Sequence, residues 1–133
     1  MKEIIIDGNN FHNGSGFMIE IWAKFSKDSD INFDSKPQLN LDALNDFLRG
    51  DWGVFKFKEP IKVKWLHSEK SRDDLGKEET LQYLLEKLKN CHPSNMELIK
   101  EEIRLVEEGK GVLLFERIMA IFKGQSHVEL ILE

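Results

Sequence analysis

The segment Ile61-Lys62-Val63-Lys64-Trp65 carries the clearest signal for the architecture of this chain. Apolar residues alternate with lysines along it, and a period of two is typical of a β-strand that buries one face and exposes the other. Pro60 stands immediately before this run, which we interpret as a half-exposed strand. How the strand pairs with others depends on the segments that precede and follow it.

Helical segments separate this strand from two other predicted strands. Residues 4–6 are a run of isoleucines, which is typical of a strand that is buried on both faces in a parallel sheet. Residues 128–132 alternate apolar residues with Glu129 and Ile131 and predict the third strand. Apolar residues at helical spacing predict the helices, which cover residues 16–25, 40–50, 77–90, 93–108 and 114–123.

These long helical connections predict how the strands pair. Parallel strands need a crossover connection, usually a helix, whereas antiparallel strands can be joined by a tight turn. The sequence therefore predicts an α/β fold with a small three-stranded parallel sheet packed with helices and right-handed crossovers. With 133 residues and 41% hydrophobic content, the chain is long enough for one core, and we expect a single domain over residues 1–133.

The acidic balance of the chain excludes some classes of function. A formal net charge of −5 argues against a general nucleic-acid binder, because such proteins need basic surfaces that neutralise phosphates. An acidic surface favours a basic partner instead, since opposite fields steer the encounter. We therefore expect a basic protein partner and no direct contact with nucleic acid.

The lone cysteine and the first residues favour a cytoplasmic location. Cys91 has no second cysteine with which to form an internal disulfide, and Met1 leads into Lys2-Glu3 without the apolar core of a signal peptide. No apolar run approaches the roughly 20 residues that cross a bilayer. We expect a cytoplasmic protein that does not enter membranes.

Two loop patterns are candidates for ligand binding. Residues 8–16 follow a strand and precede a helix, as a phosphate loop does, but they lack its glycine spacing, so a turn explains them. Residues 28–39 begin like a calcium loop, but Phe33 and Leu39 stand where glycine and glutamate are needed. A solvated acidic loop explains this segment, and we expect no metal and no cofactor.

One cluster is a candidate for catalysis. His67 and Glu69 follow a strand, which is where parallel-sheet enzymes place catalytic groups. A cap of the following helical turn by Ser68 or Ser71 explains the same residues. We expect that the chain is not an enzyme and has no catalytic residues.

Residues 40–50 predict a short helix with two different faces. Asn40 is a good N-cap, and Gly50 is a natural end. The stripe that faces the core at helical spacing consists of Leu41, Leu44 and Leu48.

The opposite stripe of this helix is polar and consists of Asp42, Asn45, Asp46 and Arg49. One interpretation is a solvated surface on which Asp46 and Arg49 pair. The other is an acidic surface that recognises a basic partner.

Four segments of the chain form a pattern in the same order as in a known family. These segments are Lys2-Glu3-Ile4-Ile5-Ile6-Asp7-Gly8, then Asn40-Leu41-Asp42-Ala43-Leu44 with Asp46 after it, then Ile61-Lys62-Val63-Lys64-Trp65 with Ser68-Glu69-Lys70-Ser71, and finally Val128-Glu129-Leu130-Ile131-Leu132-Glu133. They resemble the first strand, the acidic helix, the second strand with its tryptophan and Glu-x-Ser-basic stretch, and the closing strand of the barstar family. Residues of about 75–110 have no counterpart and look like an insertion.

The resemblance implies a fold and a function. The fold would be barstar-like, with an extra helical insertion between the second and third strands. Barstar proteins are intracellular inhibitors of a bacterial secreted ribonuclease, and their acidic helix and adjoining loop plug the active site in place of substrate phosphate. The family's key aspartates correspond to Asp42 and Asp46, and its Asn-Leu pair corresponds to Asn40 and Leu41.

Three departures put the identity of the target in doubt. Asn45 stands where barstar has a partner-facing tryptophan, and Arg49 stands where it has a threonine. The loop tryptophan is displaced as well, because Asp51 takes its position and Trp52 follows one residue later. The target implied is therefore a different ribonuclease or another toxin.

The resemblance and the helix together predict a partner-binding set, which consists of Asn40, Leu41, Asp42, Asn45, Asp46, Arg49, Gly50 and Trp52. The predicted function is an immunity-like inhibitor whose partner is a basic extracellular or toxin ribonuclease. One alternative is a barstar-like interaction module with a non-nuclease partner and the insertion as its main surface. A second alternative is a small enzyme that uses His67 and Glu69.

Overall fold

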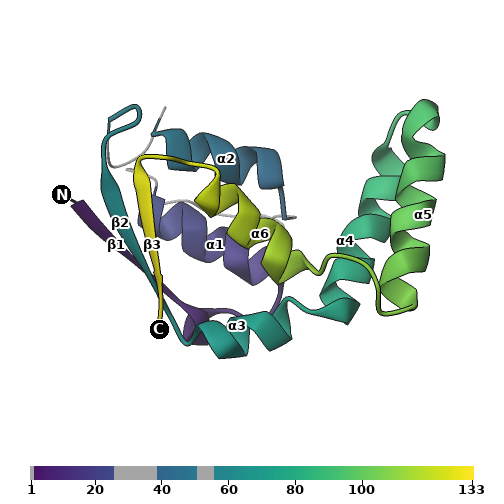
Figure 1. Cartoon of the computed structure of the whole chain (residues 1–133), viewed down its shortest axis with the longest axis horizontal. Helices are drawn as coiled ribbons and strands as arrows, with labels where there is room; N and C mark the ends of the chain where they lie inside the picture. Colours follow the sequence, from purple (N-terminus) through teal and green to yellow (C-terminus); the bar gives the residue numbers. More distant parts are fainter. Residues whose placement is uncertain (1, 26–38, 51–55) are drawn as a thin grey trace.

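A three-stranded parallel sheet forms one side of the molecule, and helices pack against it (Figure 1). The computed structural model describes residues 2–25, 39–50 and 56–133. The elements in chain order are β1 (Lys2–Asp7), the 3₁₀ helix η1 (Gly8–Asn10), α1 (Gly14–Phe25), α2 (Leu41–Arg49), β2 (Ile61–Leu66), α3 (Ser68–Asp74), α4 (Lys77–Asn90), the 3₁₀ helix η2 (Pro93–Asn95), α5 (Met96–Glu107), α6 (Leu114–Lys123) and β3 (Val128–Leu132). The predicted α/β class and the small parallel sheet are confirmed.

The sheet has β2 in the centre and β1 and β3 at its edges. The register pairs Ile4 with Val63 and Val63 with Leu130, so apolar side chains form rows on the face toward the helices. The opposite face carries a row in which Lys62 lies between Glu3 and Glu129. Opposite charges side by side stabilise such a row and keep this face polar.

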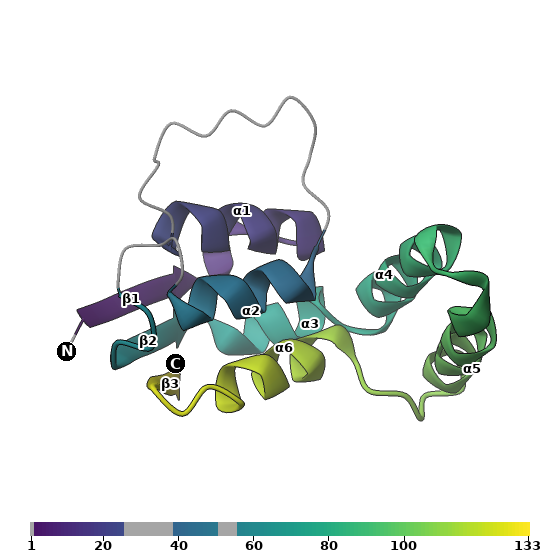
Figure 2. The same ribbon diagram turned by 90° about the horizontal axis from the view of Figure 1, so that it is seen from above.

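The prediction that residues 4–6 are buried on both faces was wrong for the middle residue. Ile4 and Ile6 are buried, but Ile5 is 40% exposed. Because β1 is an edge strand and α1, α2 and α6 lie on one side of the sheet, side chains that point to the other side meet solvent (Figure 2). The continuous run of apolar residues therefore does not mean that each of them is buried.

An aromatic cluster around Trp65 fills the core between the sheet and the helices. The indole stacks on Phe17 with ring centroids 5.4 Å apart and makes edge contacts with Phe11, Phe115 and Phe122. All five rings are at most 1% exposed. Such pairs add roughly 0.5–1.5 kcal/mol each beyond the area they bury.

Helix α3 was predicted only as a helical turn with a serine cap, and the cap prediction was wrong. His67 is the N-cap residue, in the left-handed region at φ 56°, and its side chain makes no capping hydrogen bond. The buried Ser71 hydroxyl instead accepts a hydrogen bond from Trp65 Nε1 at 2.9 Å, and Ser68 donates to the Glu133 carbonyl. Both serines thus tie the helix to the sheet.

Helices α4 and α5 lie side by side and project from the rest of the molecule (Figures 1 and 2). Their fully or nearly buried apolar residues are Leu84, Ile99 and Val106, and none of these belongs to the cluster around Trp65. We call α4, η2 and α5 the hairpin. It occupies most of the segment, about 75–110, that was predicted to be an insertion.

Two hydrogen bonds donated by backbone N–H groups hold the base of the hairpin. The Phe115 N–H donates to the Leu75 carbonyl at 3.0 Å, and the Leu114 N–H donates to Thr80 Oγ1 at 2.6 Å. The buried Thr80 hydroxyl also donates to the Gly76 carbonyl. The chain therefore leaves the body and returns to it at nearly the same point.

Candidate functional site

Helix α2 has the ends that its sequence predicts. Asn40 Oδ1 accepts a hydrogen bond from the Ala43 N–H at 3.0 Å, and Gly50 ends the helix at φ 86°. Only glycine adopts this left-handed conformation without strain. An aspartate in the first turn and an arginine in the last turn complement the helix dipole.

The apolar side of α2 fixes the helix on the body. Leu44, Phe47 and Leu48 are fully buried, whereas Leu41 is partly buried at the edge of the core. Phe47 was not included in the predicted stripe, although its spacing from Leu44 could have indicated it. His127 Nε2 lies 2.6 Å from the Leu48 carbonyl and holds the C-terminal end of the helix.

The polar side of α2 carries a mixture of engaged and accessible groups. Arg49 forms an ion pair with Asp46, and each side chain is 40% exposed. The Asn45 amide oxygen accepts a hydrogen bond from Gln125, which precedes β3. Asp42 is exposed, and within the described ranges no ion pair engages it. The pair expected from the solvated-surface interpretation is therefore present.

The predicted loop residue Trp52 lies outside the described residues, as do Asp51 and the calcium-like segment up to residue 38. Its role stays a prediction. Where the chain is described again, the Lys58 N–H donates to the Arg49 carbonyl at 2.7 Å, so residues 56–58 lie beside the end of α2. Phe57 is 60% exposed there and was not among the predicted site residues.

A groove lies between the start of α2, the start of α1 and one side of α4. Its volume is about 1040 Å³. The groove is lined by residues that include Asn40, Leu41 and Asp42 of α2, Ser15 of α1, and Glu79, Tyr83 and Glu86 of α4. No local pattern in the sequence predicts the groove, because α1, α2 and α4 are separated along the chain and come together only in the fold.

Tyr83 lines this groove, and its surroundings shift the pKa of its phenol. Burial raises its pKa above the ordinary value of 10.0; Arg117 opposes this shift, and Asp42 and Glu102 add to it. The phenol is therefore neutral over the physiological pH range and close enough to Asp42 to sense its charge.

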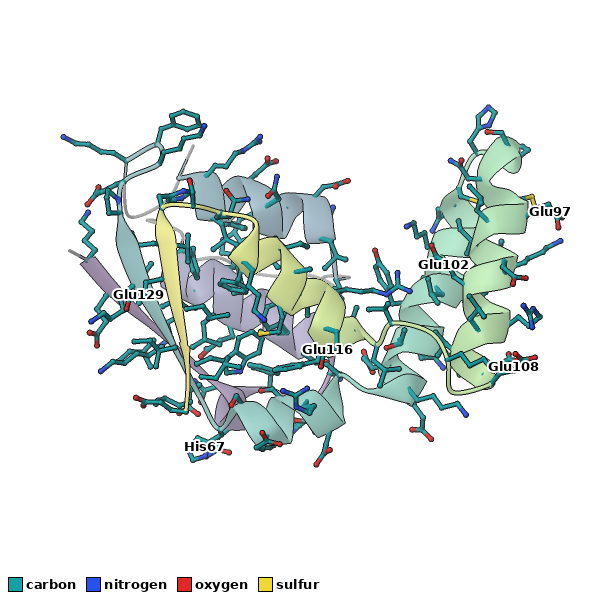
Figure 3. All side chains as sticks on the ribbon, in the orientation of Figure 1. His67, Glu97, Glu102, Glu108, Glu116 and Glu129 are labelled. Carbon is teal, nitrogen blue, oxygen red and sulfur yellow. The ribbon has the colours of Figure 1, made fainter. Side chains whose placement is uncertain are left out.

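The catalytic alternative gains little from the geometry. His67 is exposed at the end of the sheet, and the Ser68 hydroxyl next to it is bonded to the Glu133 carbonyl (Figure 3). Glu69 Oε2 lies 3.9 Å from Arg72 Nε. No base is therefore positioned against a nucleophile in this cluster as described.

Metal-binding clusters and membrane-spanning helices are both absent from the parts of the chain that the structure describes. No group of three or more His, Cys, Asp or Glu side chains there could hold a metal ion. None of the helices there has the length and apolar character needed to cross a bilayer. Cys91 is half-buried with a free thiol.

Comparisons of the chain with models of protein families, with curated proteins and with solved structures find no match.

Proposed function

We propose that this chain has a barstar-like fold and is a cytoplasmic inhibitor of a secreted or toxin ribonuclease, which binds the enzyme's basic active site through α2 and the loop after it. The observation that carries the proposal is the construction of α2. Its apolar side is fixed by three fully buried residues, while Asp42 and Asp46 lie on its accessible side. A rigid helix that presents carboxylates is suited to recognition by preorganisation.

The positions of the resembling segments support the fold. They fall on β1, on α2, on β2 with α3, and on β3. Within the third segment, the tryptophan and the serine on which the resemblance rests form the buried hydrogen bond between Trp65 and Ser71. The hairpin, which has no counterpart in the family, lies outside the aromatic core.

The chemistry of α2 suits a ribonuclease active site. Such a site must neutralise RNA phosphate, and arginine and lysine do so through charge-assisted hydrogen bonds. A carboxylate placed in the same position accepts the same bonds. Asp42 can do this as it stands, and Asp46 can do so once it is released from Arg49.

The exchange of Asp46 from Arg49 to the enzyme is energetically reasonable. An exposed ion pair contributes about 0–1 kcal/mol, whereas a hydrogen bond to a charged group that is sheltered from water contributes about 1.5–3 kcal/mol. Opening the ion pair between Asp46 and Arg49 therefore costs less free energy than the new hydrogen bonds contribute.

Arg49 also supports the second candidate, an interaction module with a non-nuclease partner. It neutralises Asp46, and Gln125 occupies the amide of Asn45, so only part of the polar face is free in the isolated chain. A partner with a weakly basic surface would suit such a face.

Co-expression separates these two functions. The chain is produced together with ribonucleases encoded next to its own gene, and cell growth and RNA cleavage are measured. Rescue of growth with loss of cleavage supports the inhibitor. Failure to suppress any of these nucleases favours the interaction module.

Two variants test the mechanism on the nuclease that is suppressed. Asp46→Ala and Asp42→Ala should each weaken inhibition by about 2 kcal/mol or more, which is about 30-fold in Ki. Asp73→Ala, on the exposed side of α3, removes the same charge elsewhere and should leave Ki unchanged. Inhibition that survives both α2 substitutions would show that α2 is not the inhibitory surface.

A further inference from the structure

The groove between α2 and α4 continues the polar face of α2 onto the hairpin. Asn40 and Asp42 belong to both surfaces, because they line the groove from the first turn of α2 and its cap. The facing wall consists of α4 residues that include Tyr83, Glu86 and Asn90. A partner that covers α2 would therefore also lie against the mouth of the groove.

The groove has the size and the lining of a site for a peptide segment. Ligand pockets commonly measure about 300–1,000 Å³, and this groove has about 1040 Å³. Its lining offers side-chain amides that can bond a peptide backbone, from Asn40, Gln82, Asn90 and Asn95. A short extended segment can therefore enter without burying unpaired polar groups.

The charges of the lining favour a basic segment. Among the residues that the structure describes, three carboxylates line the groove, those of Asp42, Glu79 and Glu86, against one cation, Lys87. Glu79 accepts a hydrogen bond from the Gly14 N–H at 2.8 Å, so it also holds the start of α1. Asp42 belongs to α2 and Glu86 to the facing helix α4, where Glu86 Oε1 lies 3.3 Å from Lys89 Nζ. Asp42 therefore offers the carboxylate for an incoming cation, and Glu86 adds negative charge on the opposite wall.

Tyr83 adds a surface on which a cation can lie. The chain's own Lys87 Nζ already lies 5.9 Å from the centre of the Tyr83 ring. An arginine or lysine that replaces it would gain a cation–π contact together with the nearby carboxylates.

We propose that this groove is a second part of the partner interface and binds an extended basic segment of the partner, with an arginine or lysine side chain between Asp42 and Tyr83. The proposal rests on the proposed function, because it takes the partner to be a basic protein that covers α2. It gives the hairpin a role: α4 supplies the wall that selects among basic partners.

A peptide titration tests the groove without any nuclease. The full chain labelled with ¹⁵N is titrated with the peptide acetyl-Gly-Arg-Gly-Arg-Gly-amide and, separately, with its glutamate counterpart. The arginine peptide should shift the amide signals of residues 39–43 and 79–90, and the glutamate peptide should not. Shifts spread over the whole acidic surface, or confined to other residues, would overturn the proposal.

A matched pair of charge reversals sharpens this test. Glu86→Lys places a cation in the groove and should weaken peptide binding by about tenfold or more. Glu97→Lys makes the same change in net charge on the outer side of α5, where Glu97 pairs with Lys100, and should change the Kd less than twofold (Figure 3). Equal effects of the two variants would mean that the peptide responds only to net charge.

A second groove variant allows the same test if Glu86→Lys does not fold. Gln82→Lys adds a cation at an exposed position of the same wall and should also weaken peptide binding. Circular dichroism must show unchanged helix content for each variant whose binding is compared. If both groove variants fold and bind the peptide as the parent chain does, the groove proposal is wrong.

The two proposals can fail separately. If no ribonuclease is suppressed but the peptide binds in the groove as expected, the inhibitor function fails and the groove stands as a site for basic segments. If a ribonuclease is inhibited and neither groove variant changes inhibition or peptide binding, the groove fails and the inhibitor function stands.

Discussion

Single residues at the carboxyl ends of β1 and β2 join the sheet to α3. Gly8 follows β1, and a Cβ atom at this position would lie 2.6 Å from Ser71 Oγ and 2.7 Å from the His67 carbonyl oxygen. Ser71 in turn binds the buried Trp65 N–H. The backbone of Gly8 therefore packs closely against the same Ser71 hydroxyl that accepts the buried hydrogen bond from Trp65.

We expect Gly8→Ala to destabilise the fold by about 1–3 kcal/mol, because overpacking displaces the backbone of β2's end. Urea denaturation followed by tryptophan fluorescence measures this change.

Ser71→Ala should cost about 1–3 kcal/mol by leaving the Trp65 N–H without its acceptor. The double variant should lose less than the sum of the two, since removing the hydroxyl relieves one of the two contacts; strict additivity would contradict the shared space. Asn9→Ala, at an exposed neighbour, is the control.

Tyr83 is the single tyrosine of the chain, so its ionisation can be followed directly. Because its pKa is raised, chiefly by burial, the tyrosinate absorbance of the folded chain should rise with a midpoint above pH 10.0. The unfolded chain loses its phenolic proton at a lower pH than the folded chain does. This group's contribution to folding stability therefore falls as pH rises from the pKa of the unfolded chain to the higher pKa of the folded chain. Tyr83→Phe should remove that part of the pH dependence, and Asp42→Asn should lower the midpoint. A midpoint at or below the ordinary value would contradict the burial of the phenol.

At the scale of elements, the helices and strands follow closely from local patterns. Asn40 and Gly50 mark the ends of α2, and the period of two in residues 61–65 predicts β2, because caps and periodicity are local properties. Ile5 was misjudged because the strand order is set by distant parts of the chain. Ser71 was misjudged because the turn at His67 brings it back onto Trp65, which lies six residues earlier. The candidate site divides in the same way: the Asp46 pair with Arg49 was foreseen, and the groove was not.

Thr80 is the residue through which α4 binds the start of α6. Thr80→Val keeps the shape of the side chain but removes the acceptor of the buried Leu114 N–H, so we expect a loss of about 1–3 kcal/mol in the free energy of unfolding. Thr80→Ser keeps the hydroxyl and should retain most of that stability. Thermal or urea denaturation of both variants checks the prediction, and equal losses would show that the methyl group matters more than the bond.

Across the molecule, the buried apolar residues in the described parts of the chain fall into two groups. The larger group surrounds Trp65, and the smaller group of Leu84, Ile99 and Val106 lies within the hairpin. Tyr83 is the hairpin residue that packs against the larger group. Few buried contacts therefore link the stability of the hairpin to that of the sheet.

We expect the hairpin to open locally while the sheet stays folded. Amide hydrogen exchange followed by NMR should give lower opening free energies for α5 than for the central strand β2, because regions with few buried contacts open most easily. Destabilising the sheet with Gly8→Ala should lower the opening free energy of β2 and leave that of α5 nearly unchanged. Identical values in both regions would mean that the molecule unfolds as one unit.

The separate base of the hairpin has a consequence for how such a chain can diversify. Because the chain leaves the body at Leu75 and returns at Phe115, whose N–H donates to the Leu75 carbonyl, the part of the hairpin beyond Thr80 and Tyr83 can vary in length and sequence at little expense to the sheet. The same segment forms one wall of the groove. Related proteins could therefore change the sequence of the hairpin as their partner changes, while the sheet and its helices stay the same.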